Sequence, residues 1–193
     1  MNKSRLEAFS DGVLAIIITI MVLELKVPHG SDWVVLQPVL AFFMSYLLSF
    51  VFIGIYWGNH HHLLHTVKNI SPGIIWANMH LLFWLSIIPF VTGWMAENSF
   101  ARNTVIVYAV LLLVCGCAFT ILQFAIQKAN KLYPALEEAF GAVKRKGYIS
   151  VICYTAAIGL AFVNTFVSGF LFVAVAIMWI VPDKNIEKAL KNE

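Results

Sequence analysis

The chain has 193 residues, of which 61% are hydrophobic and only 12% are charged, whereas soluble domains average about 45–50% apolar and about 25% charged residues. Together with a mean hydropathy of +0.83, this composition excludes a soluble globular domain and a disordered chain, and it predicts an all-α integral membrane protein. The formal net charge of +3, from 13 Lys and Arg against 10 Asp and Glu, comes from predicted loops and not from a basic face with interleaved aromatic residues, which excludes a nucleic-acid partner.

Apolar stretches follow one another along the chain, and each of the first four is long enough for one bilayer crossing of about 20 residues. Proline marks most of their boundaries, as expected at helix ends. Ser71 followed by Pro72 predicts the N-cap and first residue of the third helix, whereas Pro89 lies inside that stretch and predicts a kink. The five stretches are residues 6–25, 35–57, 73–95, 103–127 and 147–181.

The fifth stretch, 147–181, is too long for one crossing and slightly short for two, so the basic residues decide between them. A hairpin that turns near residues 164–169 divides the 13 Lys and Arg into eleven on one side of the membrane and two on the other, whereas a single crossing divides them into eight and five. By the positive-inside rule, we expect six crossings with both termini in the cytoplasm. Residues 1–193 then form one six-helix transmembrane domain with a short cytoplasmic C-terminal tail.

The first stretch carries a carboxylate, Asp11, inside an otherwise apolar helix, where a charged group costs at least about 2.5–3.5 kcal/mol and usually faces a partner or water. We interpret Asp11 either as a buried structural anchor or as a participant in ion or proton movement. An apolar stripe covers about 60° of the same helix, has Gly12 and Thr19 on its flank, and points away from Asp11. Periodicity alone favours packing of this stripe within the bundle. The stripe consists of Phe9, Ile16, Ile20 and Leu23.

Polar residues of the second and third crossings lie at the same predicted depth as the carboxylate of the first. Because unpaired polar groups are expensive in lipid, we expect these residues to form one hydrogen-bonded network. Its members are Asp11, Asn59, His60 or His61, and Asn78. The spacing of His61 and His65 suits a metal ion, but no further ligand motif accompanies it, so the sequence predicts no metal site.

Motifs for chemistry on a substrate are missing from the sequence. It contains neither G-x-x-x-x-G-K-[ST] nor G-x-G-x-x-G, and it lacks the T-V-G-Y-G filter. We therefore expect neither an enzyme nor an ATP-driven pump, and no cofactor.

The first helix opens with Arg5-x-x-x-Phe9-Ser10-Asp11-Gly12, and further motifs follow in the next two crossings. These motifs are Trp57-x-Asn59-His60-His61, Trp76-x-Asn78 and Pro89-Phe90-x-Thr92. In this order they resemble the transmembrane protein 175 potassium channels in their prokaryotic, single-repeat form. The resemblance covers the first half of the chain by motif, and the remainder only by hydropathy and topology.

The resemblance implies a homotetramer of six-helix subunits in the plasma membrane of a prokaryote, with the first helices lining a central pore that is unlike that of P-loop potassium channels. It implies potassium as the transported ion, with modest selectivity over other monovalent cations. In such a pore Ile16, Ile20 and Leu23 form hydrophobic constrictions that gate by dewetting. Thr19 faces the pore beside them and contributes to the potassium preference. The resemblance also implies a signature and bracing network that supports the pore helix, made of Arg5, Phe9, Ser10, Asp11, Asn59, His60, His61 and Asn78.

Two other functions stay open on the sequence alone. A proton-coupled secondary transporter would use Asp11 and nearby histidines as a proton relay, although neither an internal repeat nor a broken helix supports it. A non-conducting membrane interaction protein would use the basic tail and the cytoplasmic loop 128–146, in which residues 136–140 predict a short amphipathic surface helix.

Overall fold

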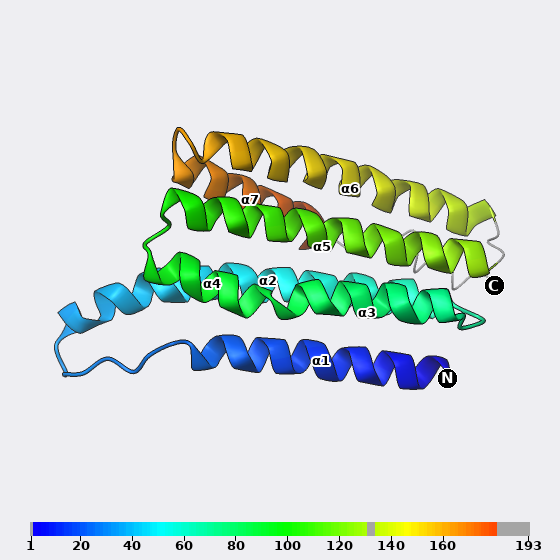
Figure 1. Ribbon diagram of the computed structural model, residues 1–193, viewed down its shortest axis with the longest axis horizontal. Coiled ribbons are helices and arrows are strands. Elements are labelled where there is room, and N and C mark those ends of the chain that lie inside the picture. The colour runs from blue at the N-terminus through cyan, green and yellow to red at the C-terminus, as the bar shows by residue number, and fades with distance from the viewer. Residues whose placement is uncertain (1, 131–133, 181–193) are drawn as a thin grey trace.

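The chain folds into long helices that lie side by side, and consecutive passes run in opposite directions (Figure 1). The computed structural model describes residues 2–130 and 134–180. Helix α1 lies at one edge of the bundle, and the α6–α7 hairpin lies at the opposite edge (Figure 1). The elements in chain order are α1 (Lys3–Leu23), η1 (Trp33–Leu36), α2 (Gln37–His65), α3 (Pro72–Ser86), α4 (Ile88–Glu97), α5 (Arg102–Ala129), α6 (Pro134–Leu160) and α7 (Thr165–Ile180).

Four helical segments among the described residues are long and apolar enough to cross a membrane, judged by length and composition. They are Lys3–Leu23, Phe42–His65, Pro72–Glu97 and Arg102–Ala129. The α6–α7 hairpin adds two more passes, which confirms the six predicted crossings. Since the number of passes is even, α7 runs back toward the end of the bundle at which α1 begins (Figure 1).

The third crossing is one span made of two helices. Ser71 caps α3 as predicted, because its Oγ accepts a hydrogen bond from the backbone N–H of Ile74 at 3.3 Å, and Pro72 follows as the first helical residue. The predicted kink at Pro89 is also confirmed, since α3 ends at Ser86 and α4 begins at Ile88. Proline has no N–H to donate to the preceding turn, so the helix breaks one turn before it.

The hairpin differs in two details from its prediction. Helix α6 is continuous from Pro134 to Leu160, so residues 136–140 belong to the crossing helix and are not a separate surface helix. No proline follows Pro134 within this helix to stop it. The turn falls at residues 161–164, earlier than predicted, because Asn164 Oδ1 accepts a hydrogen bond from the N–H of Phe166 at 2.8 Å and caps α7. The predicted cytoplasmic tail, 181–193, lies outside the described residues.

A cluster of three buried hydroxyl groups joins α2, α4 and α5 in the apolar core. Ser49 Oγ lies 2.7 Å from Thr92 Oγ1 and 2.8 Å from the Tyr108 hydroxyl. All three side chains are at most 2% exposed. Because each hydroxyl has a partner, the cluster fixes the relative positions of these helices without leaving an unpaired polar group in the core.

Candidate functional site

Helix α1 packs against the rest of the subunit through one narrow face. Five residues of this face are each at most 3% exposed, and they recur at intervals of three and four, as one side of a helix does. Their centre lies about 110° around the helix from the centre of the predicted apolar stripe. The buried residues are Leu6, Ser10, Leu14, Ile17 and Met21.

The predicted stripe itself is uncovered in the subunit. The exposed fractions are 49% for Phe9, 58% for Ile16, 44% for Ile20 and 79% for Leu23. Gly12 and Thr19 on its flank are exposed as well, and a Cβ atom added at Gly12 would meet nothing within 4 Å. The expectation from periodicity, that this stripe packs within the bundle, is therefore wrong for the single subunit. It fails because a 3.6-residue period reports an apolar face and does not report what covers it.

Thr19 places a hydroxyl group on the uncovered face of α1. Its Oγ1 donates a hydrogen bond to the carbonyl oxygen of Ile16 at 2.8 Å. A hydroxyl that donates in this way keeps lone pairs that accept from, or coordinate, a group outside the helix. The face therefore combines large apolar side chains with one oxygen that is free to act as a ligand.

Asp11 is exposed on the subunit, which corrects the expectation of a buried carboxylate. Its Oδ1 accepts a hydrogen bond from Trp57 Nε1 at 3.0 Å. Ser10, one position earlier and so rotated by about 100° around the helix, is the residue that enters the bundle, with no exposed surface. The predicted polar network consequently forms around Ser10 and not around Asp11.

Three buried side chains from three helices form this network. His60 Nε2 lies 2.6 Å from Asn78 Oδ1, and Asn78 Nδ2 donates to Ser10 Oγ at 2.9 Å. Ser10 Oγ donates in turn to the carbonyl oxygen of Leu6 at 2.8 Å. Since Asn78 Oδ1 only accepts, His60 carries its proton on Nε2, and every link of the network has one donor and one acceptor. The network thereby fixes α1 against α2 and α3.

The remaining residues of the predicted network lie beside it. Asn59 Nδ2 donates to the carbonyl oxygen of Ile55 in its own helix at 2.8 Å. The ring of His61 stacks on Trp57 with centroids 6.4 Å apart, and it lies edge-on to His65 at 4.5 Å. Within residues 2–130 and 134–180, no group of three or more His, Cys, Asp or Glu side chains is placed to hold a metal ion.

Two contacts of α1 were missed by the sequence reasoning. One is the hydrogen bond from Trp57 to Asp11. The only feature of the sequence that indicates this bond is the position of Trp57, one helical turn before His60 and so on the same side of the helix. The other joins Lys3 Nζ to the carbonyl oxygen of His65 at 2.9 Å and so places a cation at the C-terminal end of α2, where the helix dipole favours positive charge. Arg5 is exposed, and its backbone N–H donates to Asn2 Oδ1 at 3.1 Å.

Beyond the C-terminal end of α1, an ion pair joins the following loop to the end of α4. Lys26 Nζ lies 2.9 Å from Glu97 Oε1. The hydrogen bond to Glu97, followed by its negative charge, raises the pKa of Lys26 above its ordinary value. Because both side chains are more than half exposed, solvent screens the pair and its effect on stability is small.

Residues 5–89 match a family model described as "Endosomal/lysosomal potassium channel TMEM175". A protein of Chryseobacterium sp. that is named a potassium channel is 51% identical over 192 residues, which cover 100% of each chain. The chain belongs to the TMEM175 family. A protein of Streptomyces collinus, also named a potassium channel, is 31% identical to this family member over 175 residues, 85% of each chain.

A solved structure agrees with this assignment. It is the crystal structure of a lysosomal potassium-selective channel TMEM175 homolog from Chamaesiphon minutus, which matches with a TM-score of 0.77 and 27% identity over 94% of this chain and 97% of that chain. The match confirms the all-helical fold with six crossings and the resemblance to the single-repeat form. The TMEM175 family is a family of channels and not of enzymes, and its model covers all residues of the exposed stripe and of the network.

Proposed function

We propose that this TMEM175 family member conducts cations passively, with a preference for potassium, and that four subunits arrange their α1 helices around a central pore. The relatives named potassium channels support conduction of potassium. The observation that carries the proposal is the exposed face of α1, at the edge of the bundle (Figure 1), with three exposed large aliphatic side chains and one hydroxyl. The three side chains are those of Ile16, Ile20 and Leu23.

Side chains of this kind define how the pore would open and close. A ring of four isoleucine or leucine side chains is a narrow apolar constriction that excludes water, and with it ions, until it widens. Opening then requires that the α1 helices rotate or move apart. The network of Ser10, Asn78 and His60 holds the buried side of α1 in place, so it sets the position from which this movement starts.

Modest selectivity follows from the same residues. A cation that passes isoleucine and leucine rings finds no cage of carbonyl oxygens to replace its hydration shell. The remaining oxygen ligand on the face is Thr19 Oγ1, together with water. We infer that the width of the constriction and the Thr19 hydroxyl together set a preference for potassium over sodium. We also infer that conduction needs no cofactor. The subunit resides, on this proposal, in a prokaryotic plasma membrane with both termini in the cytoplasm.

The proton-coupled transporter is the less supported candidate. A relay requires the carboxylate of Asp11 to exchange protons with a neighbouring histidine. The hydrogen-bond partner of Asp11 is the indole N–H of Trp57, which donates and cannot accept a proton. His60, which is buried, bonds to Asn78.

Potassium flux from liposomes that contain the purified protein tests the proposal. A potassium gradient drives the flux, and no proton gradient is applied. Empty vesicles give the lowest potassium flux and valinomycin-treated vesicles give the highest. We expect electrogenic flux that increases in Ile16→Asn, because a polar side chain wets the constriction. The matched control is Ile152→Asn, which places the same substitution at a position of α6 that is 67% exposed, and its flux should equal that of the wild type.

The oligomeric state serves as the second measurement on the same preparation. Native mass spectrometry should detect a particle of four subunits of 21.6 kDa each. Inserted tetramers that show no flux in either the wild type or Ile16→Asn would contradict a pore lined by α1. Flux that requires a proton gradient would favour the transporter instead.

A further inference from the structure

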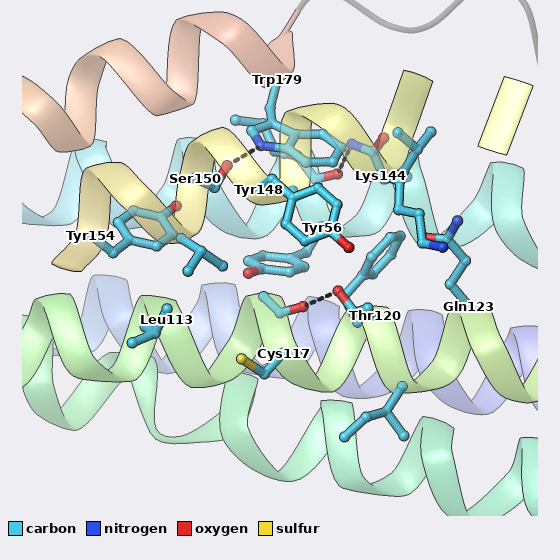
Figure 2. Close-up of a pocket in the computed structure, with 18 of the residues that line it drawn as sticks. Tyr56, Leu113, Cys117, Thr120, Gln123, Lys144, Tyr148, Ser150, Tyr154 and Trp179 are labelled. Atoms are coloured by element: carbon cyan, nitrogen blue, oxygen red, sulfur yellow. Dashed lines mark hydrogen bonds between the residues drawn. The ribbon is translucent and has the colours of Figure 1, made fainter. Parts of the chain in front are cut away.

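A cavity of about 280 Å³ lies between α2, α5, α6 and the end of α7 (Figure 2), and no residue of α1 lines it. Most of its wall is apolar or aromatic, with side chains such as Ile55, Leu113 and Phe119. Its volume is close to the lower limit of about 300 Å³ for sites that hold drug-sized ligands. The cavity therefore suits one slender apolar chain better than a ligand of several rings.

The cavity is elongated along the bundle. Leu113 and Tyr154 lie at one end of it, and Gln123 and Lys144 lie at the other (Figure 2). From Leu113 to Gln123 helix α5 rises by about 15 Å, at about 1.5 Å per residue. That length is half of a hydrocarbon core of about 30 Å, so the cavity is about as long as one leaflet is thick.

Basic and aromatic side chains surround the end near Gln123. Lys144 Nζ lies 4.9 Å from the centre of the Phe124 ring, and Lys146 Nζ lies 5.7 Å from that of Trp179. Trp179 Nε1 donates to Ser150 Oγ at 2.8 Å, which fixes the indole at the rim. Cations and tryptophan together are typical of the level of the lipid headgroups. On the orientation proposed above, this rim faces the cytoplasm.

Gln123 supplies a polar group inside this end of the cavity. Its side chain is 4% exposed, and its Nε2 is a buried donor without a hydrogen-bond partner in the described part of the chain. A buried amide N–H costs free energy unless an acceptor is supplied. A molecule that enters this end of the cavity can supply such an acceptor.

We propose that this cavity binds one acyl chain of an anionic phospholipid from the cytoplasmic leaflet, with the phosphate beside Lys144 and an ester oxygen accepting from Gln123 Nε2. Anionic lipids concentrate in that leaflet, and each Lys or Arg close to them contributes to binding. Arg145, the residue after Lys144 in α6, is exposed as well. The α6–α7 hairpin, which forms part of the wall, lies at the edge of the bundle opposite α1 (Figure 1), so on our proposal the lipid enters from the bilayer and not from the pore.

A cavity-filling variant tests the binding of the chain. A Cβ atom added at Gly116, which lines the cavity, meets nothing within 4 Å, so Gly116→Leu is the substitution chosen to fill the cavity. Gly159→Leu is the matched control, since it adds the same side chain to an open position of α6 that does not line the cavity. Elution as the native oligomer and the melting temperature verify that both variants fold.

Binding is measured by native mass spectrometry of the full chain titrated with phosphatidylglycerol or phosphatidylcholine. We expect about one phosphatidylglycerol per subunit, bound at least about fivefold more tightly than phosphatidylcholine, the factor that one Lys or Arg near an anionic surface supplies. Gly116→Leu should lose this lipid and Gly159→Leu should keep it. Lys144→Gln should reduce the preference for phosphatidylglycerol, and Gln123→Leu should weaken binding of both lipids.

Three results would overturn the proposal. Equal affinity for the two lipids would mean that the rim does not select the headgroup. Equal binding by Gly116→Leu and Gly159→Leu would place the lipid elsewhere. No bound lipid in the wild type would leave the cavity to another occupant, such as residues 181–193 of the chain. Potassium flux of the same wild-type preparation reports the proposed function separately, so failure of one proposal is distinguishable from failure of the other.

Discussion

Thr19 is the one hydroxyl among the exposed residues of α1 between Phe9 and Leu23. Its hydroxyl donates a hydrogen bond to the carbonyl oxygen of Ile16, one turn earlier, so the lone pairs of Oγ1 remain available on the exposed face. On our proposal, this oxygen is the ligand that distinguishes one cation from another in a pore built from apolar rings.

Thr19→Ala should therefore reduce the preference for potassium over sodium. The variant keeps the backbone and the neighbouring constrictions but removes the ligand oxygen. The reversal potential under bi-ionic conditions, with potassium on one side and sodium on the other, measures the preference directly. Thr19→Ser is the control and should retain most of it; a reversal potential that Thr19→Ala leaves unchanged would reject the role of Thr19.

Neighbouring residues of α1 illustrate what the sequence predicts at this scale. The apolar stripe with Ile16 and Ile20 was visible from periodicity, because period and side-chain direction follow from helix geometry alone. Which of Ser10 and Asp11 enters the bundle was not visible. That choice depends on how α1 is rotated against α2 and α3, and the buried neighbours Leu14 and Ile17 determine this rotation.

At the scale of elements, the network of Ser10, Asn78 and His60 holds three helices together. Asn78→Leu replaces the central amide by a side chain of similar size, which leaves the His60 N–H buried without an acceptor. Such a group costs about 1–3 kcal/mol. We expect the free energy of unfolding in detergent to fall by that amount.

Asn59→Leu is the matched control for this substitution. Asn59 Nδ2 bonds to a carbonyl oxygen of its own helix, so its loss should cost less than about 1 kcal/mol. The double variant His60→Leu/Asn78→Leu should cost less than the sum of the single variants, because no unpaired donor remains. Equal losses in Asn78→Leu and Asn59→Leu would mean that the network does not hold the helices.

The ion pair between Lys26 and Glu97 connects the loop after α1 to the end of α4 and depends on pH. Because the folded-state pKa of Lys26 is raised, its contribution to stability is present below the unfolded pKa and is lost as the pH rises through the folded value. Lys26→Met should therefore melt slightly below the wild type at neutral pH, and this difference should disappear at alkaline pH. A difference that persists above the pKa of Lys26 would assign it to packing of the side chain.

Element boundaries were predictable where one residue determines them. Ser71 and Pro72 begin a helix and Pro89 interrupts one because capping and the missing proline N–H act locally. The length of α6 was not predictable in the same way. Its first turns carry charges typical of a surface helix, but they continue into the membrane span because no residue stops the helix before Leu160.

At the scale of the whole molecule, our proposals assign different roles to the two edges of the bundle. The α1 edge exposes a face that, on our proposal, meets three other copies around an axis. The α5–α6 side carries the cavity and its basic rim, which on our proposal meets lipid. Sequence alone indicated the apolar face of α1 but not the cavity, because residues of four different helices form its wall (Figure 2).

The measurement that tests the central claim most directly is the accessibility of α1 to a charged thiol reagent during potassium flux. The starting protein carries Cys115→Ala, Cys117→Ser and Cys153→Ala, which remove its three cysteines, and it must first conduct like the wild type. Thr19→Cys is then compared with Phe170→Cys, a position of α7 that is 71% exposed and at the opposite edge of the bundle. We predict that a water-soluble cationic reagent blocks flux through Thr19→Cys and leaves Phe170→Cys unaffected. Flux through Thr19→Cys that the reagent does not alter, after its reaction with the thiol is verified by mass, would contradict a pore lined by α1.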